Sequence, residues 1–238
     1  MRQHIDTIPV WEAYKTDCEC PLCQLEETNE KNYVDSFMGG SVMEPDVRVE
    51  VNKKGFCGRH FKLMLANNNR LGVALMAHTY LKETMARLGE TKMAVNEPQP
   101  KSGLFGKRPQ VQAADLRGIT DSCILCDRLN ATMDRYIYTI VYMWKHDGSF
   151  RSALQSSKGM CLKHYALVLG AAPEQLSGME LKQFNDMLNK LEMDNLARLE
   201  KEIEWFTLKF DHKNADKPWG TSKDSLDRTV QKLRGKCV

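Results

Sequence analysis

One cysteine–histidine pattern occurs twice in this chain. The first copy begins with Cys20 and Cys23 in a Cys–x–x–Cys motif and continues with Cys57 and His60 in a Cys–x–x–His motif. The second copy repeats both motifs in the same order, with the residues Cys123, Cys126, Cys161 and His164. The copies are in register to within one residue. Any fold that this chain adopts must therefore accommodate eight potential metal ligands in two matching sets.

Three thiolates and one imidazole in each set are the ligands of a tetrahedral zinc site. We therefore predict two Zn²⁺ ions per chain, each bound by three cysteines and one histidine. Gly55 and Gly159 come just before the Cys–x–x–His motifs, where a metal-binding turn needs a positive φ. An iron–sulfur cluster with one histidine ligand, or dithiol chemistry, remains as an alternative. Four protein ligands leave no position for water or substrate, so zinc here would be structural.

The sequence leaves the grouping of the ligands open. Each set can close within its own copy, or Cys20 and Cys23 can pair with Cys161 and His164. Local closure costs less chain entropy, but only by about 0.6 kcal/mol for each doubling of loop length. We favour local closure mildly.

Other polar residues give weaker signals. Cys18 is a candidate extra thiol for the first set, although a small buried residue is the simpler interpretation, because Ser122 takes a similar place in the second copy. His78 lies on an apolar stripe and is interpreted as a core histidine. Arg59 and Lys163 precede the ligand histidines and can offset the negative charge of the centre. The acidic run from Glu26 to Glu30 is interpreted as a solvated face.

Composition limits the classes of function. The formal net charge is only +3, which does not by itself indicate nucleic acid or an anionic membrane as a partner. No apolar run is long enough to span a membrane, and the N-terminus lacks the apolar core of a secretory signal. A cytoplasmic location is the expectation, and in a reducing compartment grouped cysteines are more often metal ligands than disulfides.

The patterning predicts an all-α, internally duplicated helical bundle. We divide it into a first zinc-binding repeat (1–95), a Pro- and Gly-rich linker (96–118) and a second zinc-binding repeat with a tail (119–238). Helical stripes are expected at 71–88 and 131–146, and a helix of roughly 30–40 residues is expected after Pro173. Alternating valines at 47–51 allow a short extended stretch.

Several motifs resemble those of a bacterial family of unknown function that occurs mainly in Firmicutes. They are Ile8-Pro9-Val10-Trp11, Glu19-Cys20-Pro21-Leu22-Cys23, Gly39-Gly40-Ser41-Val42-Met43-Glu44-Pro45-Asp46, Lys54-Gly55-Phe56-Cys57 and the tail Pro218-Trp219-Gly220. The resemblance implies the duplicated cysteine–histidine pattern and no reaction. Some members are labelled as ABC transporter substrate-binding proteins, but this sequence shows no export signal and no α/β alternation.

The sequence therefore favours a metal-binding scaffold with two structural zinc ions that meets a protein partner or a second copy of itself. Its expected contact surfaces are the helix at 131–146 and the long helix. No catalytic motif is found, so a non-enzymatic role is favoured. The alternative is a metal–thiolate redox protein, either an iron–sulfur carrier or a zinc-held thiol sensor that uses Cys18. Nucleic-acid binding through the basic linker and tail is the weakest hypothesis.

Overall fold

The computed structural model describes residues 3–96 and 118–236, and within these ranges the chain forms helices and no strand. The predicted all-α class is confirmed. The chain divides into two compact units: unit 1 contains Met1–Thr28 and Ala131–Val238, and unit 2 contains Asn29–Asn130. Both boundaries fall inside helices, α2 (Pro21–Met38) and α7 (Ile124–His146). The division of the sequence at 95 and 119 stays a prediction, and most of the linker lies outside the described residues.

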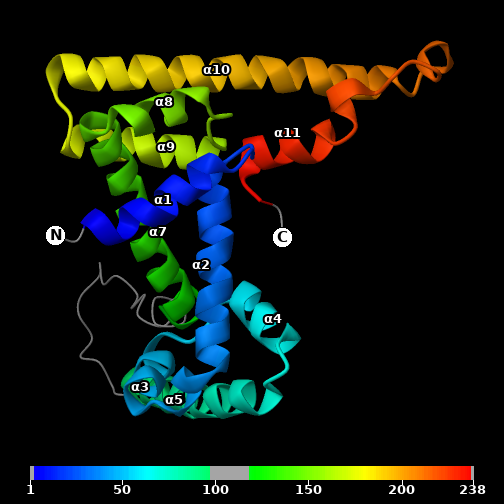
Figure 1. Ribbon diagram of the computed structural model, residues 1–238. Helices are drawn as coiled ribbons and strands as arrows, with labels where there is room; N and C mark the ends of the chain where they lie inside the picture. Colours follow the sequence, from blue (N-terminus) through cyan, green and yellow to red (C-terminus); the bar gives the residue numbers. More distant parts are fainter. Residues whose placement is uncertain (1–2, 97–117, 237–238) are drawn as a thin grey trace, which may run out of the picture. The chain divides into compact units, whose positions relative to one another are not determined.

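Unit 1 is built around the long helix α10 (Gly178–Leu208), which has 31 residues. Figure 1 shows α8 (Gly148–Ser156) and α9 (Leu162–Ala171) alongside α10, and α11 (Ser225–Arg234) returning toward α9. The predicted long helix is thus confirmed, although it begins at Gly178, because Pro173 lies in the preceding 3-10 turn Ala172–Glu174. Two further 3-10 turns, His212–Asn214 and Gly220–Ser222, connect α10 to α11.

Aromatic packing joins the remaining helices of unit 1. Helix α1 (Gln3–Lys15) contacts α8, where the fully buried Phe150 packs edge-on against Trp11 and Tyr14. Trp144 of α7 packs in the same way against Phe184 of α10. The apolar residues of α7 are therefore largely buried within unit 1, and Tyr138 is a large side chain that stays partly exposed there.

Unit 2 contains the second half of α2, the 3-10 turn Gly40–Met43, α3 (Pro45–Lys54), α4 (Gly58–Ala66), α5 (Arg70–Asn96) and the start of α7. Its core includes an edge-on series of rings, in which Phe56 packs against both Phe37 and Phe61. The extended stretch that we expected at 47–51 is wrong. Pro45 starts a helix there, and Val47 and Val51 fall one turn apart on its inner side, whereas Val49 is exposed.

Helix α5 places its apolar stripe differently from the prediction. Val73 and Met76 are buried, whereas Leu71, Leu81, Met85 and Leu88 are exposed. His78 is exposed too, so its interpretation as a core histidine is wrong. The helix has apolar residues on two faces. The face with Val73 and Met76, whose apolar spacing is less regular, supplies the core contact. No helix within the described ranges is long and apolar enough to cross a membrane.

Candidate metal centres

The two Cys–x–x–His motifs share one local conformation. Each follows a glycine in the left-handed region, Gly55 with φ 63° and Gly159 with φ 72°. Cys57 and Cys161 then sit at the N-caps of α4 and α9, so the histidine three residues later lies in the first helical turn. Residues three apart on a helix face the same side. Each motif therefore presents one sulfur and one imidazole in a common direction, as the sequence predicts.

The Cys–x–x–Cys pairs also occupy helix starts. Cys20 and Cys123 directly precede α2 and α7, and Cys23 and Cys126 lie in the first turns of these helices. The backbone N–H of Cys23 donates to Sγ of Cys20 at 3.3 Å, and that of Cys126 points to Sγ of Cys123 at 3.5 Å. Such N–H groups at a helix start favour the thiolate form of the sulfur that they face.

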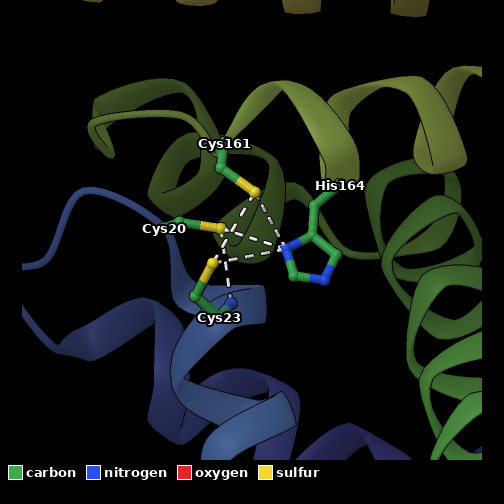
Figure 2. A group of neighbouring side chains, drawn as sticks. All are labelled: Cys20, Cys23, Cys161 and His164. Atoms are coloured by element: carbon green, nitrogen blue, oxygen red, sulfur yellow. Dashed lines mark hydrogen bonds between the residues drawn. The ribbon is translucent and has the colours of Figure 1, made fainter. Parts of the chain in front are cut away.

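The first group of potential ligands lies in unit 1 and consists of Cys20, Cys23, Cys161 and His164 (the Cys20 group, Figure 2). All four residues are buried. Nδ1 of His164 lies 3.3 Å from Sγ of Cys161, 3.4 Å from that of Cys20 and 3.5 Å from that of Cys23. The sulfurs of Cys23 and Cys161 are 3.6 Å apart. The four ligand atoms thus converge on one point.

The second group lies in unit 2 and consists of Cys57, His60, Cys123 and Cys126 (the Cys57 group). Nδ1 of His60 lies 3.2 Å from Sγ of Cys123, 3.3 Å from that of Cys57 and 3.5 Å from that of Cys126. The sulfurs of Cys57 and Cys126 are 3.8 Å apart. His60 and Cys123 are buried, whereas Cys57 and Cys126 are partly exposed. This group repeats the geometry of the Cys20 group but is more open to solvent.

The structure thus brings together all eight predicted ligand residues, but the grouping that we favoured is wrong. Each Cys–x–x–Cys pair meets the Cys–x–x–His motif of the other copy. The entropic preference for local closure is small, about 0.6 kcal/mol per doubling of loop length, so packing decides. After Cys23 the chain continues through α2, whose 18 residues extend about 27 Å before the first Cys–x–x–His motif is reached.

The distances fit a tetrahedral metal ion. Zinc–sulfur bonds of about 2.3 Å and zinc–nitrogen bonds of about 2.0–2.1 Å place tetrahedral ligand atoms about 3.5–3.8 Å apart. The sulfur–nitrogen and sulfur–sulfur separations given above run from 3.2 to 3.8 Å. A disulfide would need sulfurs about 2.05 Å apart, and the described cysteines are all free. Both groups could therefore hold a single metal ion of this size.

Protonation in the two groups is unequal when no metal is present. Hydrogen bonding with Cys161 raises the pKa of Cys23 to about 11, whereas hydrogen bonds from Cys20 and Cys23 hold the pKa of Cys161 far below its usual range. Burial raises the pKa of Cys126 to about 12. Burial also tends to raise the pKa of Cys57. Hydrogen bonds from the backbone N–H of His60 and from the neighbouring thiols outweigh this effect, so the pKa of Cys57 is lowered. Burial lowers the pKa of His60, which favours the neutral imidazole that binds metals.

Each ligand histidine also contacts a carboxylate of α2 through its other ring nitrogen. Nε2 of His60 lies 3.1 Å from Oε1 of Glu30, and Nε2 of His164 lies 3.5 Å from Oε2 of Glu26. The prediction of a solvated acidic face is wrong for Glu30, which is buried. Its signal was present in the sequence, because Glu26 and Glu30 follow Cys23 by three and seven residues and so share its helix face.

The basic residues before the histidines contact these carboxylates. Arg59 donates to both carboxylate oxygens of Glu30, at 2.8 and 2.7 Å. Lys163 donates to Oε1 of Glu26 at 2.7 Å. Both cations are half exposed. Arg59 and Lys163 thus reach the predicted surroundings of the two centres, but their charge is paired with the outer carboxylates.

A buried ion pair supports the turn of the Cys20 group. Lys232 of α11 is fully buried and donates from Nζ to the carbonyl oxygen of Lys158 at 2.5 Å. Its Nζ also lies 3.1 Å from Oε2 of Glu192, whose Oε1 accepts from the backbone N–H of Met160 at 2.6 Å. Burial raises the pKa of Glu192. Sequence reasoning missed this pair, since nothing in a solvated helical pattern marks one lysine as buried.

The Cys57 group obtains equivalent support from short-chain polar groups. The hydroxyl of Ser122 donates to the carbonyl oxygen of Lys54 at 2.6 Å, at the position that Lys158 takes in the other group. The backbone N–H of Ile124 donates to the carbonyl oxygen of Gly55 at 3.1 Å. Tyr80 lies against Gly55 and donates its hydroxyl to the carbonyl oxygen of Ile119. Each turn is therefore fixed by hydrogen bonds from a different element.

Cys18 stands apart from both groups. It is not among the convergent ligand atoms of the described residues, and burial raises its pKa above that of an ordinary thiol. It lines a cavity of about 920 Å³ beside Cys20. Charged groups of that cavity pair with one another, including Lys158 with Asp17 at 2.6 Å and Arg198 with the buried Glu19 at 2.6 Å. The cavity gives Cys18 a polar setting, and its raised pKa does not favour a reactive thiolate.

Comparison with known proteins identifies a family and no activity. The model of a family described as "Family of unknown function (DUF6062)" matches residues 1–238. No curated protein and no solved structure gives a match.

Proposed function

The chain belongs to this family of unknown function over its whole length, and we propose that it is a zinc-binding scaffold whose two ions are structural. The observation that carries the proposal is the convergence of three sulfurs and one Nδ1 in each group, at separations that match a tetrahedral ion. Four protein ligands complete the coordination of zinc, which leaves no open position for catalysis.

Zinc is favoured over an iron–sulfur cluster by the compactness of each group. All four ligand atoms lie within 4.8 Å of one another and surround one point. A cluster contains at least two irons, each with its own protein ligands, so its ligand atoms lie further apart than those around a single ion. Soft sulfur ligands in a tetrahedral arrangement are typical of zinc.

The proposed role of the ions is to stabilise each unit. Each one would join a helix start, at α2 or α7, to a turn that is distant in the sequence. Metal binding is coupled to folding in small sites of this type. The proposal includes a reducing, cytoplasmic setting, which is supported by the seven free cysteines among the described residues. It also includes a protein partner or a second copy. The apolar residues of the helix expected as its surface, at 131–146, are largely buried within unit 1, whereas Leu71, Leu81 and Met85 of α5 are exposed and support a contact there.

Metal analysis tests the proposal. Protein purified under reducing conditions should contain two zinc ions per chain, be colourless, and show zinc–sulfur and zinc–nitrogen distances in X-ray absorption spectra. Anomalous diffraction at the zinc edge should place one ion in each group. A brown protein with iron and acid-labile sulfide, or a folded protein that takes up no metal under zinc-replete conditions, would overturn the proposal.

A zinc-held thiol switch is the second candidate, and the Cys57 group supports it. Cys57 and Cys126 are partly exposed, so peroxide can reach their sulfurs. Zinc holds its cysteine ligands as thiolates, and accessible thiolates are the ones that peroxides oxidise first. Under this candidate, hydrogen peroxide would oxidise two of the thiolates to a disulfide, be reduced to water and release zinc. Zinc release at micromolar peroxide that a thiol reductant reverses would favour it over the purely structural role.

A further inference from the structure

The two histidines are each contacted on the side away from the sulfurs, and by the same type of group. In both, Nδ1 faces the three sulfurs and Nε2 faces a carboxylate of α2. We propose that Glu30 and Glu26 are outer-sphere positioning residues that fix the ring orientation and tautomer of His60 and His164 for metal binding through Nδ1. This inference rests on the proposed zinc function and adds residues that the ligand pattern does not contain.

Tautomer selection is the physical basis. A neutral imidazole carries one proton, and binding a metal through Nδ1 requires that the proton is on Nε2. A carboxylate that accepts that proton in a hydrogen bond holds the ring and makes Nδ1 a stronger donor to the metal. The 3.1 Å contact at His60 has the distance but not the alignment of a hydrogen bond, so the bond itself is part of the proposal. His60 and His164 are 2% and 1% exposed, so water has little access to replace the carboxylates.

The carboxylates are themselves held in place. Arg59 binds Glu30 through two parallel N–H···O contacts, a geometry that fixes the plane of the carboxylate. Lys163 binds Glu26 as a single point charge. Two features make the Glu30 contact the tighter one. Its distance to the ring is 3.1 Å against 3.5 Å for Glu26, and its side chain is 10% exposed against 26%.

In each group, three side chains therefore form a series of contacts that runs from the surface to the ligand group. A half-exposed cation orients a carboxylate, the carboxylate orients the imidazole, and the imidazole completes the ligand group. The same order of residue types occurs in both groups: the cation lies on the helix of the histidine, α4 or α9, and the carboxylate lies on α2. Two occurrences in one chain argue against an incidental surface ion pair.

Zinc-loaded full-length protein tests the inference without any substitution. Long-range ¹H–¹⁵N spectra identify which ring nitrogen binds the metal and which carries the proton. We expect metal-bound Nδ1 and a slowly exchanging proton on Nε2 in both histidines. Ligation through Nε2, or an Nε2 proton that exchanges as fast as in free histidine, would overturn the proposal even if two zinc ions are bound.

Substitution then separates positioning from simple stability. We expect Glu30→Ala to weaken zinc binding by the Cys57 group about 10–100-fold, the range found for outer-sphere partners of metal ligands. Glu30→Gln should retain most of the affinity, because its amide oxygen still accepts from Nε2. Glu26→Ala should weaken zinc binding by the Cys20 group, by a smaller factor. Asp35→Asn is the matched control, since it removes one exposed acidic charge from the same helix and contacts neither group.

The outcomes distinguish this inference from the proposed function. Two zinc ions with unchanged affinity in Glu30→Ala and Glu26→Ala would overturn the positioning role and leave the zinc scaffold intact. A wild-type protein that binds no metal would overturn both. If Glu30→Ala does not fold, the ring spectra of the wild type and the affinity of Glu30→Gln decide the matter. An Arg59→Gln variant should show a smaller loss than Glu30→Ala.

Discussion

Cys23 and Cys161 lie 3.6 Å apart through their sulfurs, although 138 residues separate them in the chain. Each belongs to a different copy of the repeated motif. Together with Cys20 and His164 they form one compact ligand group inside unit 1. The two copies in the sequence therefore do not correspond to the two metal centres. Each centre combines a Cys–x–x–Cys pair from one copy with the Cys–x–x–His motif of the other.

Paired cysteine substitutions test this exchange. The double variant Cys23→Ser/Cys161→Ser removes two ligands from one centre, so we expect it to retain one zinc ion per chain. The double variant Cys23→Ser/Cys57→Ser removes one ligand from each centre, and we expect both ions to bind weakly or be lost. Zinc content measured by mass spectrometry of the metal distinguishes them. The reverse result would mean that each centre closes within one copy.

The ligand residues and the helical class could be predicted from the sequence because both depend on local patterns. Cys–x–x–Cys and Cys–x–x–His each fix their own turn, as Gly55 and Gly159 show by their positive φ. The pairing of these motifs could not be predicted from the sequence. It depends on packing between helices that are distant in the chain, and chain entropy barely distinguishes the alternatives.

Outer contacts were missed for a related reason. Glu30 and Lys232 look like surface residues, and only tertiary packing buries them. The stripe on α5 is the opposite case, because its regular apolar spacing predicts a core face although Leu81 and Met85 are exposed. A helix with apolar residues on two faces does not reveal from its sequence which face the protein covers.

Gly55 and Gly159, the glycines before the Cys–x–x–His motifs, should tolerate no side chain. A Cβ at Gly55 would lie 2.3 Å from a ring carbon of Tyr80, and one at Gly159 would lie 2.3 Å from Oε1 of Glu192. Both also have positive φ, so alanine would be strained even with space. We expect each Gly→Ala change to destabilise its unit by at least about 1–3 kcal/mol, as measured by denaturant midpoints under saturating zinc.

Gly170→Ala serves as the control for this prediction. Gly170 lies inside α9, and a Cβ added there would meet no atom within 4 Å, so alanine should be neutral or stabilise the helix by up to about 1 kcal/mol. Equal effects of alanine at positions 159 and 170 would contradict the role of the positive φ.

The buried Lys232–Glu192 pair should be costly to break on one side. Lys232→Met leaves the carboxylate of Glu192 buried without its cation and removes the bond to the carbonyl oxygen of Lys158. Loss of one partner of a buried pair typically costs about 3–5 kcal/mol. We expect a lower denaturant midpoint and faster zinc release from the Cys20 group, while the Cys57 group keeps its ion. Adding Glu192→Gln to Lys232→Met should restore part of the stability, and a Lys232→Met variant as stable as wild type would contradict the prediction.

Cys18 should be dispensable for metal binding. Its sulfur is outside the ligand group, and its pKa is raised by burial. Cys18→Ser is therefore expected to keep two zinc ions with unchanged affinity, whereas Cys20→Ser should lose the ion of its group. Loss of one ion in Cys18→Ser would show that this thiol takes part in binding.

Zinc affinity should increase with pH. In the metal-free protein the pKa values of Cys23 and Cys126 are raised to about 11 and about 12, so both thiols are protonated at neutral pH. Zinc binds thiolates, and each of these protons must leave when the ion enters. Lowering the pH adds protons to the competing metal-free state and weakens binding, by up to a factor of about ten per pH unit for each proton released. Competition with a chelator at mildly acidic, neutral and mildly alkaline pH, corrected for the pH dependence of the chelator itself, measures the slope. An affinity independent of pH would mean that the cysteines are already thiolates before the metal arrives, or that they do not bind it.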